Sequence, residues 1–219
     1  MNDKERKIIK QLNKIGVDTR YISLYRDTIY INNLKFSKFS RKKEEEFNIY
    51  YPEINVIRSK LLQKICIKVS RTIKNQIKPR DTIYIEDDKT PESILLYILL
   101  EAYKRKYGIK ITNKKTSHTK TASCKCINDF ATEYIDLMTT ANKIHNDFEE
   151  NMIYPLMHID YQWIKEWIDS TTIEYIEKRT NQKQTSHQII EFLETKIPNV
   201  QESIIKSVEY IDEKHIENR

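Results

Sequence analysis

Strand-like and helix-like segments alternate after Pro79, and this alternation is the strongest constraint on the fold. Strand-like runs are rich in β-branched residues, whereas the helical runs place apolar residues at helical spacing. The predicted strands are Thr82–Glu86, Ile109–Thr112 and Ala122–Ile127, and the predicted helices are Glu92–Arg105 and Asp129–Asn146. Because such alternation is typical of parallel sheets covered by helices, we predict an α/β core.

The flanking segments predict two further regions. On the N-terminal side we expect a helix, a β-hairpin, a charged loop and a long basic helix, over Asp3–Ile15, Thr19–Phe36, Lys35–Glu46 and Glu53–Gln76. On the C-terminal side we expect helices at Tyr161–Thr180, Ser186–Lys196 and Val200–Lys214. The predicted organisation is therefore an N-terminal helix and hairpin (1–50), the α/β core (51–150) and a helical tail (151–219).

Glycine is scarce in this chain, with two in 219 residues, against a usual share of about 7%. Loops that wrap phosphate groups use glycine because its backbone approaches an anion closely and adopts positive φ. An ordinary nucleotide site is therefore not expected.

Residues 77–85, I-K-P-R-D-T-I-Y-I, resemble the lead-in of the PP-loop ATPases, also known as N-type ATP pyrophosphatases. In that family the strand runs into the phosphate loop S-G-G-x-D-S, which aligns here with Asp88, Lys89, Thr90, Pro91, Glu92 and Ser93. Only Ser93 is identical, and Glu92 keeps a carboxylate. An aspartate at position 88 repels phosphate, and Pro91 lacks an N–H. The resemblance thus implies a degenerate loop that does not hold ATP in the family's manner.

A second stretch resembles the A-T-G-H-N-L-D-D motif of the cytosolic tRNA 2-thiolation branch of that family; it includes Cys124, Lys125, Cys126, Asn128 and Asp129. The helical tail follows the order of the same branch, so the resemblance covers about residues 55–212. It implies a reduced parallel sheet of the adenine nucleotide alpha-hydrolase type, flanked by helices. One or two strand–helix units between Ile111 and Ala122 are missing, and the N-terminal hairpin resembles the branch's zinc ribbon without its cysteines.

The three cysteines do not predict a metal or disulfide site. Cys124 and Cys126 lack the two-residue spacer usual for zinc, and no second pair completes a site. We interpret them, and Cys66, as buried structural residues and expect no cofactor. An odd cysteine count and the lack of a signal peptide favour the cytoplasm. The longest apolar run, Ile94–Leu100, is too short for a bilayer, which takes about 20 residues.

Charge is divided unevenly along the chain. Residues 1–80 hold 20 Lys and Arg against 8 Asp and Glu, whereas the remainder is net acidic. One face of the predicted helix 53–76 is basic, and we predict that it contacts RNA through Arg58, Lys60, Lys64, Lys68, Arg71 and Lys74. The aromatic residues of the hairpin either stack on unpaired bases or form the hairpin's own core.

These features favour a noncatalytic pseudoenzyme. The resemblance implies an accessory subunit in tRNA wobble-uridine 2-thiolation that binds tRNA, a catalytic PP-loop paralogue, or both. One alternative is a general RNA-binding or protein-interaction module unrelated to thiolation. The other is a divergent ATP-dependent tRNA-modifying enzyme that acts through Glu92, Ser93 and Asp129.

Overall fold

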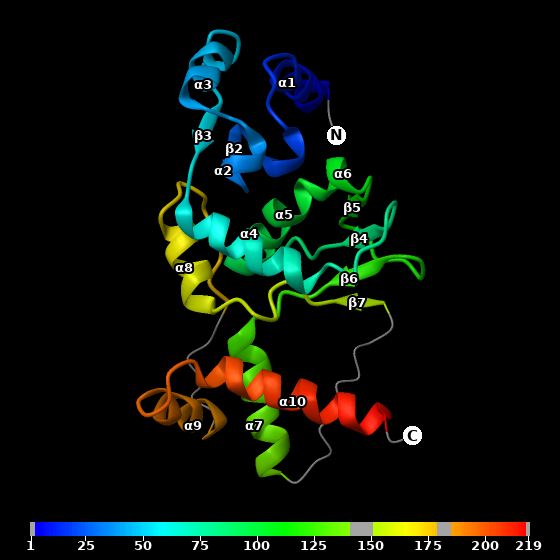
Figure 1. Cartoon of the computed structure of the whole chain (residues 1–219), viewed down its shortest axis with the longest axis vertical. Helices are drawn as coiled ribbons and strands as arrows, with labels where there is room; N and C mark the ends of the chain where they lie inside the picture. Colours follow the sequence, from blue (N-terminus) through cyan, green and yellow to red (C-terminus); the bar gives the residue numbers. More distant parts are fainter. Residues whose placement is uncertain (1–2, 141–150, 179–184, 218–219) are drawn as a thin grey trace.

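The computed structural model describes residues 3–140, 151–178 and 185–217, and it contains two β-sheets and a separate group of helices (Figure 1). One sheet, of three strands, belongs to the N-terminal part of the chain. The other, of four strands, lies at the centre. Within the described ranges no helix is long and apolar enough to cross a membrane.

The N-terminal sheet has the order β1-β2-β3. Strands β1 (Ile22–Tyr25) and β2 (Thr28–Ile31) form the predicted hairpin, and Arg26 at its turn has a left-handed backbone (φ 52°). Strand β3 (Asn55–Ile57) then joins β2 in parallel. Helix α1 (Asp3–Lys14), the 3₁₀ turn η1 (Thr19–Tyr21) and helix α2 (Leu34–Ser37) complete this unit. Its core is apolar and includes Ile8, Leu12, Ile22, Ile29 and Phe47.

Two predictions for this region were wrong. The predicted charged loop 35–46 contains helix α3 (Arg41–Asn48), which begins where the Ser40 hydroxyl accepts from the N–H of Lys43. Phe47 anchors this helix edge-on against Phe39, while Arg41, Lys42, Glu45 and Glu46 are exposed. The long basic helix starts later than predicted, because 55–57 pairs with β2; helix α4 spans Lys60–Thr72.

The central sheet is parallel, with the order β5-β4-β6-β7. Its strands are β4 (Thr82–Tyr84), β5 (Lys110–Thr112), β6 (Lys120–Ala122) and β7 (Met152–Ile153), the last of which was not predicted. One hydrophobic core joins this sheet to α4, α5 (Pro91–Glu101) and α8 (Tyr161–Asp169). The short helix α6 (Tyr103–Lys106) follows α5. The predicted fold class, a parallel sheet flanked by helices, is confirmed.

Three helices lie together beyond the central sheet (Figure 1). Helix α7 (Ile127–Thr139) packs against α9 (Thr185–Glu194) and α10 (Val200–Glu217). Their shared apolar cores include Phe130, Tyr134, Ile190, Ile205 and Val208. Helix α7 begins at Ile127, within the predicted strand 122–127, because the backbone N–H of Cys126 is capped by the Asp129 carboxylate at 2.7 Å.

A buried ion pair joins the N-terminal unit to the central sheet. Glu101, at the end of α5, accepts two hydrogen bonds from Arg105 (2.6 and 2.7 Å) and one from the backbone N–H of Leu24 (2.9 Å). Arg105 also donates to the carbonyls of Thr19 and Ile22, both at 2.7 Å. The side chains of Glu101 and Arg105 are only 3% and 11% exposed. Every charge in this joint is therefore matched by a hydrogen-bond partner.

Replacing Glu101 with Ala should destabilise the protein by about 3 kcal/mol, because it leaves the Arg105 guanidinium buried without its carboxylate. Urea unfolding followed by circular dichroism measures the change. The matched control is Lys4→Ala, which breaks the exposed ion pair to Asp27 and should cause no measurable change. Equal stability of the two variants would mean that the Glu101–Arg105 ion pair contributes nothing to the free energy of unfolding.

Candidate functional site

The sheet order has a topological switch point between β4 and β6, the place where open α/β sheets form a ligand crevice. The chain leaves β4 through α5 to reach β5 on one side, and leaves β6 through α7 to reach β7 on the other. In open α/β sheets such a switch point, at the carboxyl ends of the strands, is where ligands bind. The loop 85–90 follows β4 and the loop 123–126 follows β6. The two motifs singled out in the sequence therefore meet at one site.

At the start of α5, the chain's own side chains take up backbone donors. Lys89 has a left-handed backbone (φ 58°) at the position where the PP-loop motif has glycine. Thr90 is the N-cap of α5, and its hydroxyl accepts from the N–H of Ser93 at 3.3 Å. Pro91 has no N–H to offer. The helix terminus is thus capped by the chain's own side chains.

The Asp88 carboxylate accepts hydrogen bonds from further donors beside this loop. Its Oδ1 accepts from the N–H of Thr90 at 3.1 Å and from the Thr90 hydroxyl at 2.8 Å, and its Oδ2 lies 3.1 Å from Nζ of Lys178. Burial would raise the pKa of Asp88, but the hydrogen bonds from Ser93, Thr90 and Lys178 outweigh it and lower the pKa to about 2. A permanently ionised carboxylate therefore lies at the N-terminus of α5, where a helix favours negative charge.

Cys124 follows β6 on the other side of the crevice. Burial is the main cause that raises the pKa of its thiol to about 12, and the carboxylates of Asp88, Glu92 and Glu86 add to the effect. The thiol is consequently protonated at neutral pH. Lys125, the next residue, is half-exposed and forms an ion pair with Glu133 of α7, with 2.7 Å between Nζ and the carboxylate oxygen.

Cys126, Asn128 and Asp129 have structural contacts in the same loop. Asp129 caps the N-terminus of α7, as described above. The side-chain oxygen of Asn128 accepts from the Cys126 thiol at 3.3 Å and from the backbone N–H of Tyr161 at 2.8 Å. These contacts hold the start of α7 against the start of α8.

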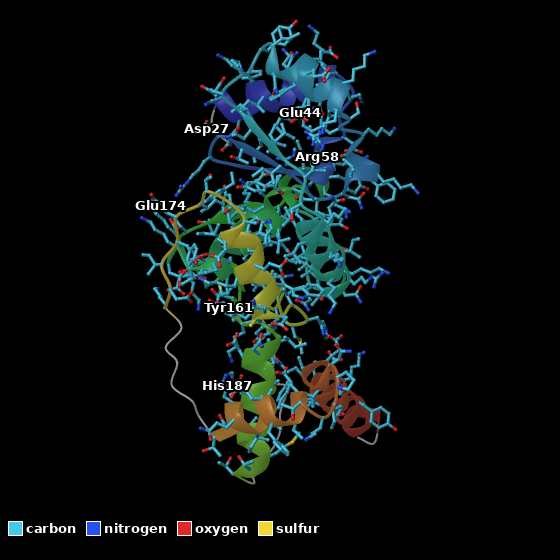
Figure 2. The ribbon with its side chains drawn as sticks, turned by 90° about the vertical axis from the view of Figure 1, so that its left-hand side faces the viewer. Asp27, Glu44, Arg58, Tyr161, Glu174 and His187 are labelled. Atoms are coloured by element: carbon cyan, nitrogen blue, oxygen red, sulfur yellow. The ribbon has the colours of Figure 1, made fainter. Side chains whose placement is uncertain are left out.

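Residues 171–178, here termed the closing segment, lie against the loop after β4. The predicted helix 161–180 ends early, at Asp169, and Tyr161 and Glu174 mark α8 and the segment that follows it (Figure 2). The N–H of Ile176 donates to the carbonyl of Lys89 at 2.9 Å. Glu177 accepts from the Tyr161 hydroxyl (2.6 Å) and from Lys165 (2.9 Å).

Sequence reasoning missed Lys178 and Glu86 as members of this site. Lys178 lies 90 residues from Asp88 in the chain and belongs to no recognisable motif. Glu86 is the last residue of the predicted strand Thr82–Glu86, so its place at the carboxyl end of that strand was a signal that could have been used.

The predicted basic face divides into two groups. Arg58 is largely buried, 2.6 Å from Glu44 (Figure 2), and it also donates to the carbonyl of Phe39. Lys68 donates to the carbonyl of His158 at 3.2 Å and to Glu202 at 3.4 Å. The other four, here termed the basic stripe, are exposed and form no ion pair with any residue in the described ranges: Lys60, Lys64, Arg71 and Lys74.

The aromatic residues of the hairpin region also fall into a buried group and an exposed group. Tyr30 is buried edge-on against Trp167, and Phe39 is buried against Phe47. Phe36 is exposed and lies 5.3 Å from the ring of Tyr21. Most of this set therefore serves the core of the N-terminal unit and its contact with α8.

Comparison with known proteins places this fold. No family model matches the chain. It is 38% identical over 97 residues to a probable sulfurtransferase of Methanocaldococcus jannaschii, a match that covers 42% of this chain and 27% of the relative. The solved structure of the U34-tRNA thiolase NcsA from Methanococcus maripaludis, with its 4Fe-4S cluster, superposes with a TM-score of 0.56 at 11% identity. That match covers 74% of this chain and 83% of the thiolase.

The fold is thus that of a tRNA thiolase, but the cysteines do not fit an iron–sulfur cluster. The chain has three, and all lie in the described ranges. Cys66 is on α4, away from the crevice loops, and burial raises the pKa of its thiol to about 12. Among the described residues, no group of three His, Cys, Asp or Glu side chains could hold a metal ion.

Cys124 should resist alkylation in the native protein. With its pKa raised to about 12, the thiolate at pH 8 is roughly a thousandfold scarcer than in the unfolded chain. Trypsin cleaves after Lys125, so mass spectrometry follows Cys124 and Cys126 in separate peptides. We expect iodoacetamide to modify Cys124 at least a hundredfold more slowly in the native state than in urea. Rates within tenfold of each other would reveal a reactive thiolate.

Proposed function

We propose that this chain is a noncatalytic member of the tRNA-thiolating PP-loop proteins, binding tRNA and supporting wobble-uridine 2-thiolation performed by a catalytic paralogue. The thiolase-like fold and the similarity to a probable sulfurtransferase support the family. The observation that carries the noncatalytic role is the Asp88 carboxylate at the N-terminus of α5. This carboxylate accepts a hydrogen bond from the N–H of Thr90 and forms an ion pair with Lys178. Asp88 therefore occupies donors that a bound phosphate would need.

Two further observations argue against chemistry at this crevice. The Cys124 thiol is protonated and faces carboxylates, and those carboxylates also repel the phosphates of ATP. The closing segment is hydrogen-bonded to the loop at Lys89. A nucleotide would have to displace the Asp88–Lys178 ion pair and meet an acidic surface.

Magnesium ATP should therefore show no saturable binding to the protein in isothermal titration calorimetry at concentrations up to about 1 mM, a limit equivalent to roughly 4 kcal/mol. The divergent-enzyme alternative predicts the opposite. Saturable binding that is lost in Glu92→Ala, and kept in the exposed-site control Glu133→Ala, would establish a functional nucleotide site and overturn the noncatalytic role.

The basic stripe is the proposed RNA contact. Helix α4 contains no acidic residue, and its exposed cations follow one face of the helix and continue into the turn beyond it. Cations without acidic partners attract a polyanion and release its counterions on binding. Because Arg58 and Lys68 are held by other parts of the protein, we assign the phosphate contacts to the basic stripe alone.

Replacing Lys64 and Arg71 with Gln should weaken tRNA binding and make its salt dependence shallower. Each lost phosphate contact reduces the slope of log K against log salt by about 0.7–0.9, so the double variant should lose about 1.5. Fluorescence anisotropy across a salt series measures this slope. The control, Lys10→Gln with Lys14→Gln on α1, makes the same change of net charge at exposed positions. If both double variants change the slope equally, the stripe has no special role.

A further inference from the structure

A cavity lies away from the switch point of the central sheet, between the central unit and the C-terminal helices. Its volume is about 260 Å³, and its walls come from α4, α8 and the chain that joins α9 to α10. It is large enough for a small planar group and too small for a long peptide.

Two buried side-chain atoms at this cavity have no hydrogen-bond partner. Gln201 is 8% exposed; its Nε2 donates to Glu194, which identifies Oε1 as the free end of the amide. His158 Nδ1 is also buried, and the nearest oxygen of Glu202 is 3.8 Å away, beyond hydrogen-bonding distance. We assign the ring proton to Nε2, which lies 3.8 Å from Glu209, and this leaves Nδ1 as an acceptor. Buried polar atoms are nearly always paired, so two open acceptors at one cavity indicate a ligand that supplies N–H donors.

The charges around the cavity restrict what this ligand can be. Carboxylates of Asp160, Glu194 and Glu202 line it, and they disfavour a phosphate. The Lys68 ammonium already supplies a cation at this cavity, 5.5 Å from the centre of the Trp163 ring and 3.4 Å from Glu202. A neutral group with N–H donors and a flat face suits the open acceptors and the indole of Trp163.

The cavity also lies next to the basic stripe. Lys68, in its wall, is on α4 between Lys64 and Arg71, about one helical turn from each. An RNA whose phosphates follow the stripe would therefore pass close to Lys68, in the wall of the cavity. A base turned out of that strand reaches a site that matches its hydrogen-bonding edge.

We propose that this cavity binds one unpaired nucleobase with an exocyclic amino group, such as adenine or cytosine. The inference rests on the proposed RNA-binding function and adds a preference for the base. Gln201 Oε1 and His158 Nδ1 accept from the base, and Trp163 contacts its face. Uracil, which lacks the amino group, leaves one acceptor unpaired, and sites of this kind reject such analogues.

The test is the affinity of short oligo(A), oligo(C) and oligo(U) RNAs, measured by fluorescence anisotropy at one salt concentration. The wild-type protein should bind oligo(A) and oligo(C) about tenfold more tightly than oligo(U), a difference typical of a buried hydrogen bond. Gln201→Met keeps the side-chain length and should remove the preference while leaving the salt slope unchanged. The control is Gln188→Met, at an exposed position of α9; it should keep the preference.

Trp163 provides a second readout that needs no change at Gln201. Stacking of a base should quench its fluorescence when oligo(A) binds, and the quenching should be absent in Trp163→Phe. Equal affinity for the three RNAs, or binding without quenching of Trp163, would overturn the base pocket while the stripe-dependent function stands. If none of the RNAs binds, both the pocket and the proposed RNA-binding function are wrong.

Discussion

Burial of helix α5 on all sides is the constraint on which the rest of the structure depends. Ten of its eleven residues are buried, including the polar Glu92, Ser93 and Glu101. A helix that is apolar around its whole circumference has no solvent face and must be enclosed by other elements. Here β1, α8 and the central sheet enclose it. Its two ends are therefore held in place, and each end carries one of the polar clusters of the molecule.

The two ends of α5 have different roles. At its C-terminus, Glu101 and Arg105 bind the backbone of the N-terminal unit, so the hairpin and the central sheet form one body. At its N-terminus, Thr90 and Asp88 satisfy donors that a phosphate loop leaves open. The fold is thus similar to that of a tRNA thiolase, while the terminus that favours an anion already holds the carboxylate of Asp88, paired with Lys178.

Much of this architecture could be predicted from the sequence, because strands and helices with clear periodicity follow one another after Pro79. The hairpin, α1, the strands β4 and β5, and the helices α5, α9 and α10 lie within a few residues of their predicted places. The errors have physical causes. Helix α3 has a single apolar anchor, Phe47, among charged residues, so its period is hard to detect. Strand β3 is defined by pairing to a distant strand, which no local pattern records.

The two motifs of the candidate site could be predicted from the sequence, whereas the closing segment that packs against them could not. Asp88 and Cys124 were identified by resemblance, and the parallel sheet brings their loops together. Lys178 and the closing segment reach the site only through tertiary packing. The sequence likewise indicated a basic face on the predicted helix 53–76, but Arg58 and Lys68 could not be separated from the exposed stripe without knowledge of their partners Glu44 and Glu202.

The central claim is that the protein supports thiolation without catalysing it. The most direct measurement is the 2-thiouridine content of tRNA, by mass spectrometry, in cells that lack the chain and are complemented with variants. Our account predicts that Cys124→Ser combined with Glu92→Gln restores the wild-type level, whereas Lys64→Gln combined with Arg71→Gln does not. Restoration by the stripe variant and failure of the crevice variant, with both proteins present at equal levels, would contradict it.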